Sequence, residues 1–154
     1  PGVEIRAFAV GDGDTAYVAP RTNNGIVLKV DFRDGSVEVV AGPYETSPLL
    51  EEVRPEAGVL EGSIFSVSDM SVSPTGHVAL LDSTKRGTFI GLLEPQIGTL
   101  VRIVGKGPKD NVGDGKLATD AEIRGGLIVF DDYGNLYIET NTRIRRINRP
   151  TAMN

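Results

Sequence analysis

The stretch "GLIVFDDYGNLYIETNTRIRRI", Gly126 to Ile147, contains three short apolar or alternating runs with turn residues between them. The runs are "GLIVFD" (Gly126–Asp131), "LYIET" (Leu136–Thr140) and "RIRRI" (Arg143–Ile147), and an Asp/Gly/Asn turn separates the first two. β-Branched and aromatic runs with such turns between them are typical of antiparallel meanders. The stretch therefore predicts three consecutive strands of one sheet.

Two earlier parts of the chain show the same order of runs and turns. Four strands are predicted in each part: Val3–Val10, Thr15–Pro20, Gly25–Phe32 and Ser36–Gly42, then Asp69–Pro74, His77–Ser83, Gly87–Glu94 and Thr99–Gly105. In the aligned copies, Val10, Val72 and Phe130 precede the turn residues Asp14, Gly76 and Gly134, respectively, at the same spacing. The repeat interval is about 60 residues, made of a spacer and a unit of about 42 residues, which is the length of a propeller blade.

The repeats also predict the domain organisation. A four-stranded sheet cannot bury both of its faces alone, whereas sheets stacked against copies of themselves can. A radial stack of such sheets is a β-propeller, so we expect an all-β chain that forms one partial propeller over 1–154. Its predicted parts are a first blade at 1–42, an insertion at 43–68, a second blade at 69–105, a loop at 106–125 and an incomplete third blade at 126–154.

With the units aligned, the third one resembles the NHL repeat, a propeller-blade motif. "GDGKLATDAEI" (Gly113–Ile123) is similar to the inter-blade loop of bacterial and teneurin NHL repeats, and Gly126–Ile147 is similar to the blade core with its Asn-x-Arg-Ile-Arg-x-Ile end. "NNGIVLKVDFRDGSVEVVAG" (Asn23–Gly42) resembles the last two strands of a blade, whereas "KRGTFIGL" (Lys85–Leu92) has lost the arginine pattern. The resemblance covers most of the chain outside 43–68 and implies a scaffold on which many functions are built.

The third unit departs from the NHL pattern because no fourth strand follows Ile147. Since NHL propellers generally close with about six blades, the resemblance implies that about three blades form an open arc, half of a ring. An open arc leaves two apolar blade faces in water, which favours association. Three sources of the other half stay open: a second copy in a homodimer, a different chain, or further sequence of a longer parent.

Composition and charge exclude several classes of function. The net charge of −5 makes the chain as a whole a poor binder of polyanions, which require an excess of Lys and Arg. There is no cysteine, so disulfides and thiolate metal sites are excluded. No apolar run approaches the roughly 18 residues that span a bilayer. The only histidine, His77, lies at a hairpin turn and is expected to be exposed, so no catalytic residue is predicted and the chain is expected not to be an enzyme.

Two Gly/Asp turns have the composition of ligand-binding loops. "GDGK" (Gly113–Lys116) is too short for a phosphate loop, which also needs Ser or Thr after the lysine and a following helix. Calcium loops use alternating oxygen ligands and a distant closing Glu. Asp12 and Asp14 are the candidates for such a site, but they lack the closing Glu and also fit the preference of hairpin turns for Asp. Two alternatives therefore stay open: the chain binds no cofactor, or it binds a calcium ion.

Four arginines, Arg143, Arg145, Arg146 and Arg149, form a basic cluster. Some NHL propellers bind RNA through a basic face, by contacts with phosphate. Arg143 and Arg145 alternate with Ile144, however, as a strand with one buried face requires, and the family carries arginine at these positions in proteins that bind no nucleic acid. The four arginines are the candidate binding residues, and salt bridges to acidic neighbours are their competing use.

Together, these observations predict a non-enzymatic binding or assembly module of a secreted or cell-surface protein, whose propeller loops recognise a protein or glycan partner. Two alternatives stay open: part of an enzymatic propeller of the lyase or hydrolase type, or RNA binding through the arginine edge. Within the insertion, Pro48–Val53 is expected to form a short helical turn, followed by a loop that either carries function or covers the edge of a blade.

Overall fold

The computed structural model describes residues 3–21, 26–42, 66–84, 87–96, 99–105, 123 and 125–150. These residues form three antiparallel sheets of four, four and three strands. The first sheet contains β1 (Ile5–Val10), β2 (Thr15–Pro20), β3 (Val27–Asp31) and β4 (Val37–Ala41). The second contains β5 (Val67–Val72), β6 (Val78–Thr84), β7 (Gly87–Glu94) and β8 (Thr99–Val104). The third contains β9 (Gly125–Phe130), β10 (Leu136–Thr140) and β11 (Arg143–Ile147), and the predicted all-β class is confirmed.

The strands lie close to the ranges predicted from alternation and turn residues. The largest difference is at β5, which begins at Val67 rather than at Asp69, because Val67 pairs with Asp82 across a register shift. The predicted helical turn at Pro48–Val53 and the "GDGK" loop lie outside the described residues. No helix in the described part of the chain combines the length and the apolar character that a bilayer span requires.

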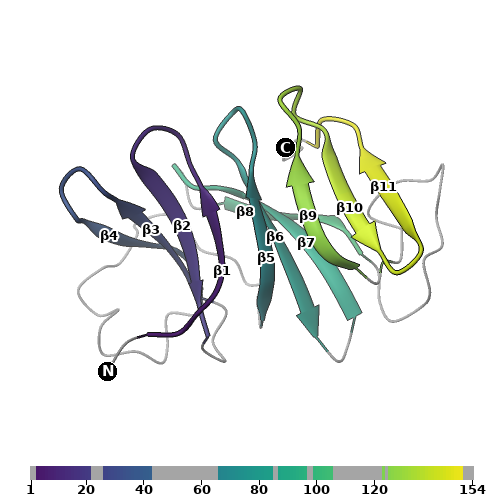
Figure 1. The fold of residues 1–154 in the computed structure, drawn as a ribbon, viewed down its shortest axis with the longest axis horizontal. Helices are drawn as coiled ribbons and strands as arrows, with labels where there is room; N and C mark the ends of the chain where they lie inside the picture. The colour runs from purple at the N-terminus through teal and green to yellow at the C-terminus, as the bar shows by residue number, and fades with distance from the viewer. Residues whose placement is uncertain are drawn as a thin grey trace.

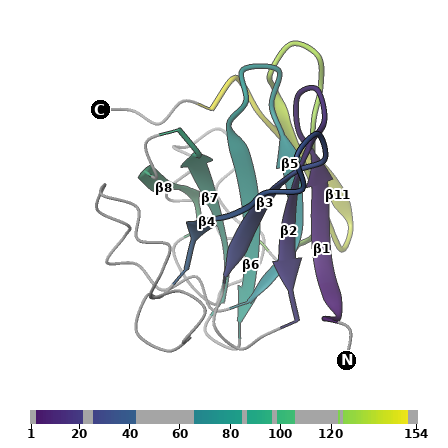
Figure 2. The ribbon, with the colours of Figure 1, turned by 90° about the vertical axis from the view of Figure 1, so that its left-hand side faces the viewer.

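The three sheets stand side by side, and each follows the chain as a simple meander (Figure 1). β1 contacts β5, and β5 contacts β9, so the first strands of the sheets form a row. In the view turned by 90°, β1 lies at one side of the molecule while β4 and β8 lie toward the other (Figure 2). This arrangement of repeated sheets is compatible with a propeller.

The first hairpins of the three sheets have the same register. The cross-strand pairs next to their turns are Val10–Ala16, Val72–Val78 and Phe130–Leu136. These pairs are the ones that the sequence alignment brings together, so the repeat alignment is confirmed at these strands. One turn differs in detail: the left-handed backbone lies at Gly76 (φ 85°) and Gly134 (φ 80°) in two turns, but at Gly13 (φ 63°) rather than Asp14 in the first.

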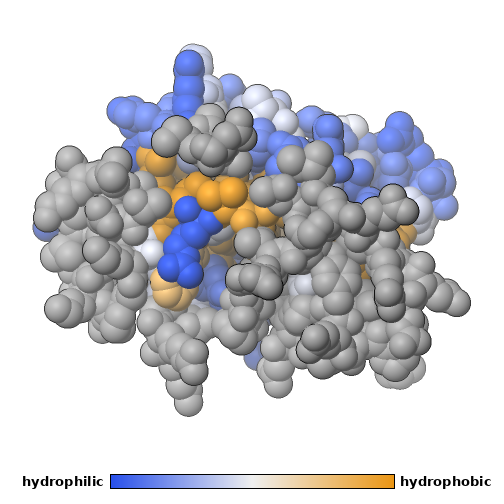
Figure 3. Space-filling view, turned by 180° about the vertical axis from the view of Figure 1, so that it is seen from behind, coloured by the Kyte–Doolittle hydropathy of each residue, from blue (hydrophilic) through white to orange (hydrophobic). Residues whose placement is uncertain are grey.

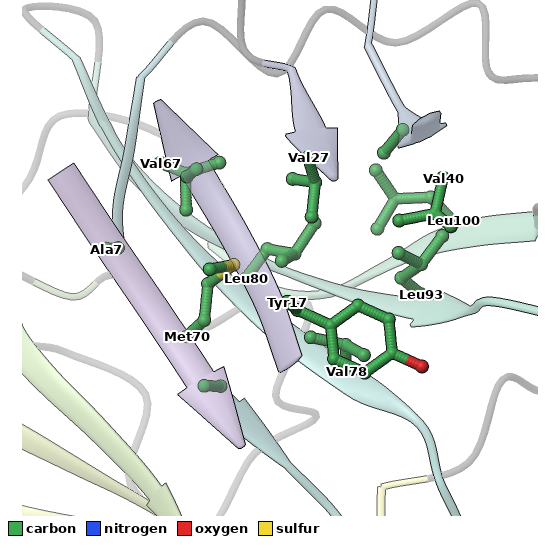
Figure 4. Close-up of a cluster of buried hydrophobic side chains, with 13 residues drawn as sticks. Ala7, Tyr17, Val27, Val40, Val67, Met70, Val78, Leu80, Leu93 and Leu100 are labelled. Atoms are coloured by element: carbon green, nitrogen blue, oxygen red, sulfur yellow. The ribbon is translucent and has the colours of Figure 1, made fainter. Parts of the chain in front are cut away.

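Two hydrophobic cores hold the sheets together. The first junction, between the first and second sheets, buries Ala7, Ala9, Tyr17, Ala19, Val27, Val40 and Ala41 against Val67, Met70, Val78, Leu80, Leu93 and Leu100. Figure 4 shows these side chains pointing toward one another from the two sheets. The second junction, between the second and third sheets, buries Ala79, Leu81, Ile90, Leu92, Ile103, Val104, Ile123, Ile128, Leu136 and Ile138. The second sheet therefore buries apolar side chains on both faces, the main source of stability in such a stack.

The second junction also contains two hydrogen bonds between sheets. The Asp69 carboxylate of β5 accepts one from the Ile128 N–H of β9, with an N···O distance of 2.6 Å. The Ser71 hydroxyl accepts another from the Phe130 N–H, with a distance of 2.9 Å. They satisfy N–H groups on the edge of β9 that does not face β10. In β1 the equivalent positions are occupied by alanine, so the first junction has no such pair.

The faces of β11 are reversed relative to the expectation from the sequence. Ile144, expected on the buried face, is 76% exposed. Arg145 is half-buried and lies opposite Ile138, which is 1% exposed. The alternation along the strand is as predicted, but the register with β10 turns Arg145, and not Ile144, toward the second sheet.

Candidate binding surfaces

Hairpin turns of all three sheets gather at the upper edge of the molecule in Figures 1 and 2. We call this edge the turn edge and define it by residues 11–14, 32–36, 73–77 and 131–135. Two aromatic side chains are exposed on it, Phe32 at 68% and Tyr133 at 76%. From the opposite side, hydrophilic atoms predominate along the upper edge and hydrophobic atoms gather below it (Figure 3). The turn edge is therefore a polar surface with two exposed aromatic groups.

Two carboxylates of the turn edge and its flanking strands bond their own turns. Asp131 Oδ1 accepts hydrogen bonds from the N–H groups of Tyr133 (3.0 Å) and Asn135 (2.8 Å), and Oδ2 accepts one from the Asn135 side chain (2.9 Å). The hydrogen bond from the Asn135 side chain is the main reason that the pKa of Asp131 is lowered. The pKa of Asp31 is lowered by its side-chain hydrogen bonds from Arg33. Both carboxyl groups are ionised at neutral pH, which makes them poor proton donors.

Asp12 and Asp14, the candidate calcium ligands, are exposed and belong to the first turn. The Asp12 carbonyl accepts a hydrogen bond from the Thr15 hydroxyl (2.8 Å), and the Asp14 carbonyl accepts one from the Phe32 N–H (2.7 Å). Among the described residues, no three His, Cys, Asp or Glu side chains gather closely enough to hold a metal ion. Both residues thus have a role in shaping turns, and the calcium site stays a prediction without a third ligand.

The four candidate arginines do not share one face. Arg143 and Arg145 lie on the face of β11 that turns toward the second sheet, because they pair with Thr140 and Ile138. Arg146 lies on the opposite face, and Arg149 follows the strand with a left-handed φ of 37°. A continuous row of phosphate contacts needs side chains on one surface, so the strand divides the predicted cluster.

His77 is less exposed than its place beside a turn predicts, with 27% of the side chain accessible. Its Nε2 lies 2.7 Å from Glu94 Oε2, and its Nδ1 lies 3.0 Å from the Thr75 hydroxyl. Both ring nitrogens are therefore engaged, and the imidazole links the start of β6 to the end of β7.

Each of the two outer sheets has one face on which no other sheet of the described residues packs. The N-terminal end face consists of Phe8, Val10, Ala16, Val18, Leu28, Val30, Val37 and Val39 of the first sheet. Within it Phe8, Val10 and Val37 are exposed, whereas Ala16 (7%) and Val39 (6%) are already buried. The C-terminal end face consists of Leu127, Val129, Tyr137, Glu139, Ile144 and Arg146 of the third sheet. Phe8 (65%) and Val10 (69%) of β1 and Leu127 (63%) and Val129 (57%) of β9 are strongly exposed apolar side chains on these faces. Exposed apolar patches of this kind mark interaction sites, although the C-terminal end face also carries Glu139 and Arg146.

Four residues at the turn edge or in the second junction were not predicted from the sequence. Phe32 and Tyr133 are the aromatic residues inside Asp/Gly turns, an unusual position for a large apolar side chain. Asp69 and Ser71 alternate with apolar residues in "VSDMSV" (Val67–Val72), and this alternation of polar residues was the available signal. Their partners lie in another repeat, so no local pattern could identify them.

No protein-family model matches the chain, and no curated protein matches it either. Among solved structures, 23 chains match. One is the crystal structure of a structural genomics protein of unknown function from Bacteroides thetaiotaomicron, which is 14% identical with a TM-score of 0.47. The match covers 92% of this chain and 46% of that one, so the chain spans less than half the length of its structural neighbour.

Proposed function

We propose that the chain is an arc of an NHL-type β-propeller and acts as a non-enzymatic binding module, which recognises a protein or glycan partner through the turn edge. The observation that carries the proposal is the pair of exposed aromatic side chains, Phe32 and Tyr133, on rigid hairpin turns. Aromatic side chains give large contact areas at a small entropic cost and dominate many binding surfaces.

The repeated architecture supports the propeller part of the proposal. The three sheets follow one another in the same strand order, with their first strands in a row and their first hairpins in the same register. A radial array of four-stranded antiparallel sheets is the defining arrangement of propellers. The "GDGKLATDAEI" and Asn-x-Arg-Ile-Arg-x-Ile motifs support the NHL type within that class.

Rigidity of the turns supports the binding part. The Asp131 turn is fixed by hydrogen bonds from Tyr133, Gly134 and Asn135, so the Tyr133 side chain is held on an ordered backbone. The Phe32 N–H bonds the Asp14 carbonyl of the neighbouring turn, which fixes Phe32 in the same way. Such contact residues lose little conformational freedom when a partner binds.

The chemistry of the turn edge supports a role without catalysis. Asp31 and Asp131 are committed to their turns, and His77 is bonded through both ring nitrogens. General acid–base catalysis needs a group that can reach a substrate and exchange a proton near neutral pH. A lowered carboxyl pKa works against that requirement.

The proposal is tested by screening the chain against a glycan array and a displayed peptide library, followed by titration of the best ligand. We expect Phe32→Ala and Tyr133→Ala each to weaken binding by about 10-fold or more, the usual effect of losing an aromatic anchor. Val3→Ala removes an apolar side chain that is 71% exposed and lies outside the turn edge and both end faces, so it should leave affinity unchanged. Ligands that bind all three variants equally would contradict a binding site on the turn edge.

A further inference from the structure

We propose that the N-terminal and C-terminal end faces are the two halves of one further junction, and that a second copy of this chain completes it head to tail. The inference rests on the proposed propeller architecture. Each copy would pack its N-terminal end face on the C-terminal end face of the other, so two identical junctions would join the pair into a closed ring.

The N-terminal end face carries apolar residues at positions that the other sheets bury. Phe8 of β1 is 65% exposed, whereas Met70 of β5 and Ile128 of β9, at the equivalent position, are 4% and 5% exposed. Val37 of β4 is 53% exposed, whereas Leu100 of β8 is 7% exposed. These positions are covered wherever a preceding sheet is present, and only the first sheet lacks one among the described residues.

The C-terminal end face shows the same relation in the other direction. Ile144 of β11 is 76% exposed, whereas Val27 of β3 and Ile90 of β7, at the equivalent position, are fully buried. Leu127 of β9 is 63% exposed, whereas Ala7 of β1 is 7% exposed. These positions are covered wherever a following sheet is present. The two end faces are therefore continuations of the interior junctions rather than scattered apolar groups.

A second copy can complete the junction because one chain carries both kinds of face, with three strands on the C-terminal end face and four on the N-terminal end face. At each interior junction, one face of a sheet packs against the opposite face of the next sheet along the chain. The C-terminal end face corresponds to the face that packs on the next sheet. The N-terminal end face corresponds to the face that packs on the preceding sheet. Head-to-tail contacts of this sort form closed rings when the rotation closes, and with two copies the ring has two-fold symmetry.

The charges on these surfaces are compatible with the junction. The N-terminal end face has no charged side chain, and the C-terminal end face has one acidic and one basic residue, Glu139 and Arg146, on neighbouring strands. Lys29 occupies the position of Arg146 in the first sheet, opposite Glu38, on the face that forms the first junction. A basic residue at this position is thus already accommodated within an interior junction.

The experiment is sedimentation equilibrium or light scattering of the purified chain over a series of concentrations. The monomer has a mass of 16.4 kDa, and we expect twice this mass at micromolar concentrations. Phe8→Asp and Leu127→Lys, at exposed sites on opposite end faces, should each give a monomer. A charge buried without a partner should weaken each junction by about 100-fold, and two junctions raise the dissociation constant of the pair by about 10⁴-fold.

The decisive step is to mix the two variants. By analogy with the contact between Asp69 and Ile128, the aspartate introduced by Phe8→Asp would then meet the lysine introduced by Leu127→Lys at one junction. The other junction is unaltered, so the mixture should recover the dimer. Pro74→Asp, which adds the same charge to a turn of the second sheet, should remain dimeric. Recovery on mixing also shows that both variants are folded.

Several results would overturn the inference. They are a monomeric wild-type chain, a ring of more than two copies, and a dimer that only one of the two substitutions disrupts, which would indicate a contact between identical faces. None of them bears on the turn edge, because the test of the proposed function measures the effects of Phe32→Ala and Tyr133→Ala on ligand affinity. Failure of one proposal is therefore distinguishable from failure of the other.

Discussion

The second and third sheets carry the same residue type at one structural position in opposite surroundings. Ile90 of β7 is fully buried, and Ile144 of β11 is 76% exposed, although both occupy the same register position opposite the middle of the preceding strand. Ile90 is buried because the third sheet packs on that face of the second. The comparison shows that burial in this chain depends on the neighbour of a sheet as much as on the residues of the strand.

Truncation of the two isoleucines is the strongest test of this comparison. We expect Ile90→Ala to lower the free energy of unfolding by about 2–5 kcal/mol, because it leaves a cavity in a packed core. Ile144→Ala should change it by less than about 0.5 kcal/mol, as at other exposed sites. Urea denaturation measures both values, in a Phe8→Asp background that excludes any contribution from association. Similar losses at the two positions would contradict the comparison.

The polar contacts of the second junction give the next largest effect. Asp69→Ala leaves the Ile128 N–H without its acceptor in a partly buried site, which should cost about 1–3 kcal/mol. Hydrogen exchange of the Ile128 amide should accelerate more than that of amides in the first sheet. Asp132→Ala, at an exposed turn position, serves as the control. Unchanged exchange at Ile128 would show that this hydrogen bond does not hold the third sheet.

Substitutions in the turns of the second and third sheets should lower stability equally, whereas substitutions on their faces should not. Gly76 and Gly134 have left-handed backbones, and a Cβ at either would meet no atom within 4 Å. Alanine at each should therefore cost about 1–2 kcal/mol from backbone conformation alone. Thermal or urea unfolding of Gly76→Ala and Gly134→Ala checks the values. A clear difference between them would indicate that neighbouring sheets also influence the turns.

The smallest expected effect is a pH dependence of the stability of the turn between β9 and β10. The pKa of Asp131 is lowered by hydrogen bonding from Asn135, so its contribution to stability is present at neutral pH and is lost as pH falls below about 4. The second sheet has Ser73 at this turn position, and its hydroxyl accepts from the His77 N–H without titrating in this range. Acid should therefore speed exchange of the Asn135 amide relative to that of Gly76, whose N–H bonds the Ser73 carbonyl, after correction for intrinsic rates. Asp131→Asn should abolish the difference.

Much of the fold could be predicted because its information is local. Alternating residues and Asp/Gly turns give the strands, and the spacing of turns gives the repeat. The choice of buried face at β11 could not be predicted in the same way, because Ile144 and Arg145 each mark one face of the strand and only the register with Ile138 decides between them. The contacts of Asp69 and Ser71 with β9 depend on another repeat, so they too required the three-dimensional arrangement.

The hydrogen bonds from Asp69 and Ser71 also constrain how such a chain could evolve by rearrangement of its repeats. If the first unit were placed directly before the third, Ala7 and Ala9 would face β9, and the N–H groups of Ile128 and Phe130 would lose their acceptors. The second unit is thus the suitable predecessor of the third, although apolar packing alone would tolerate either. A duplication that copied the second and third units together would keep this pair intact, and one that separated them would not.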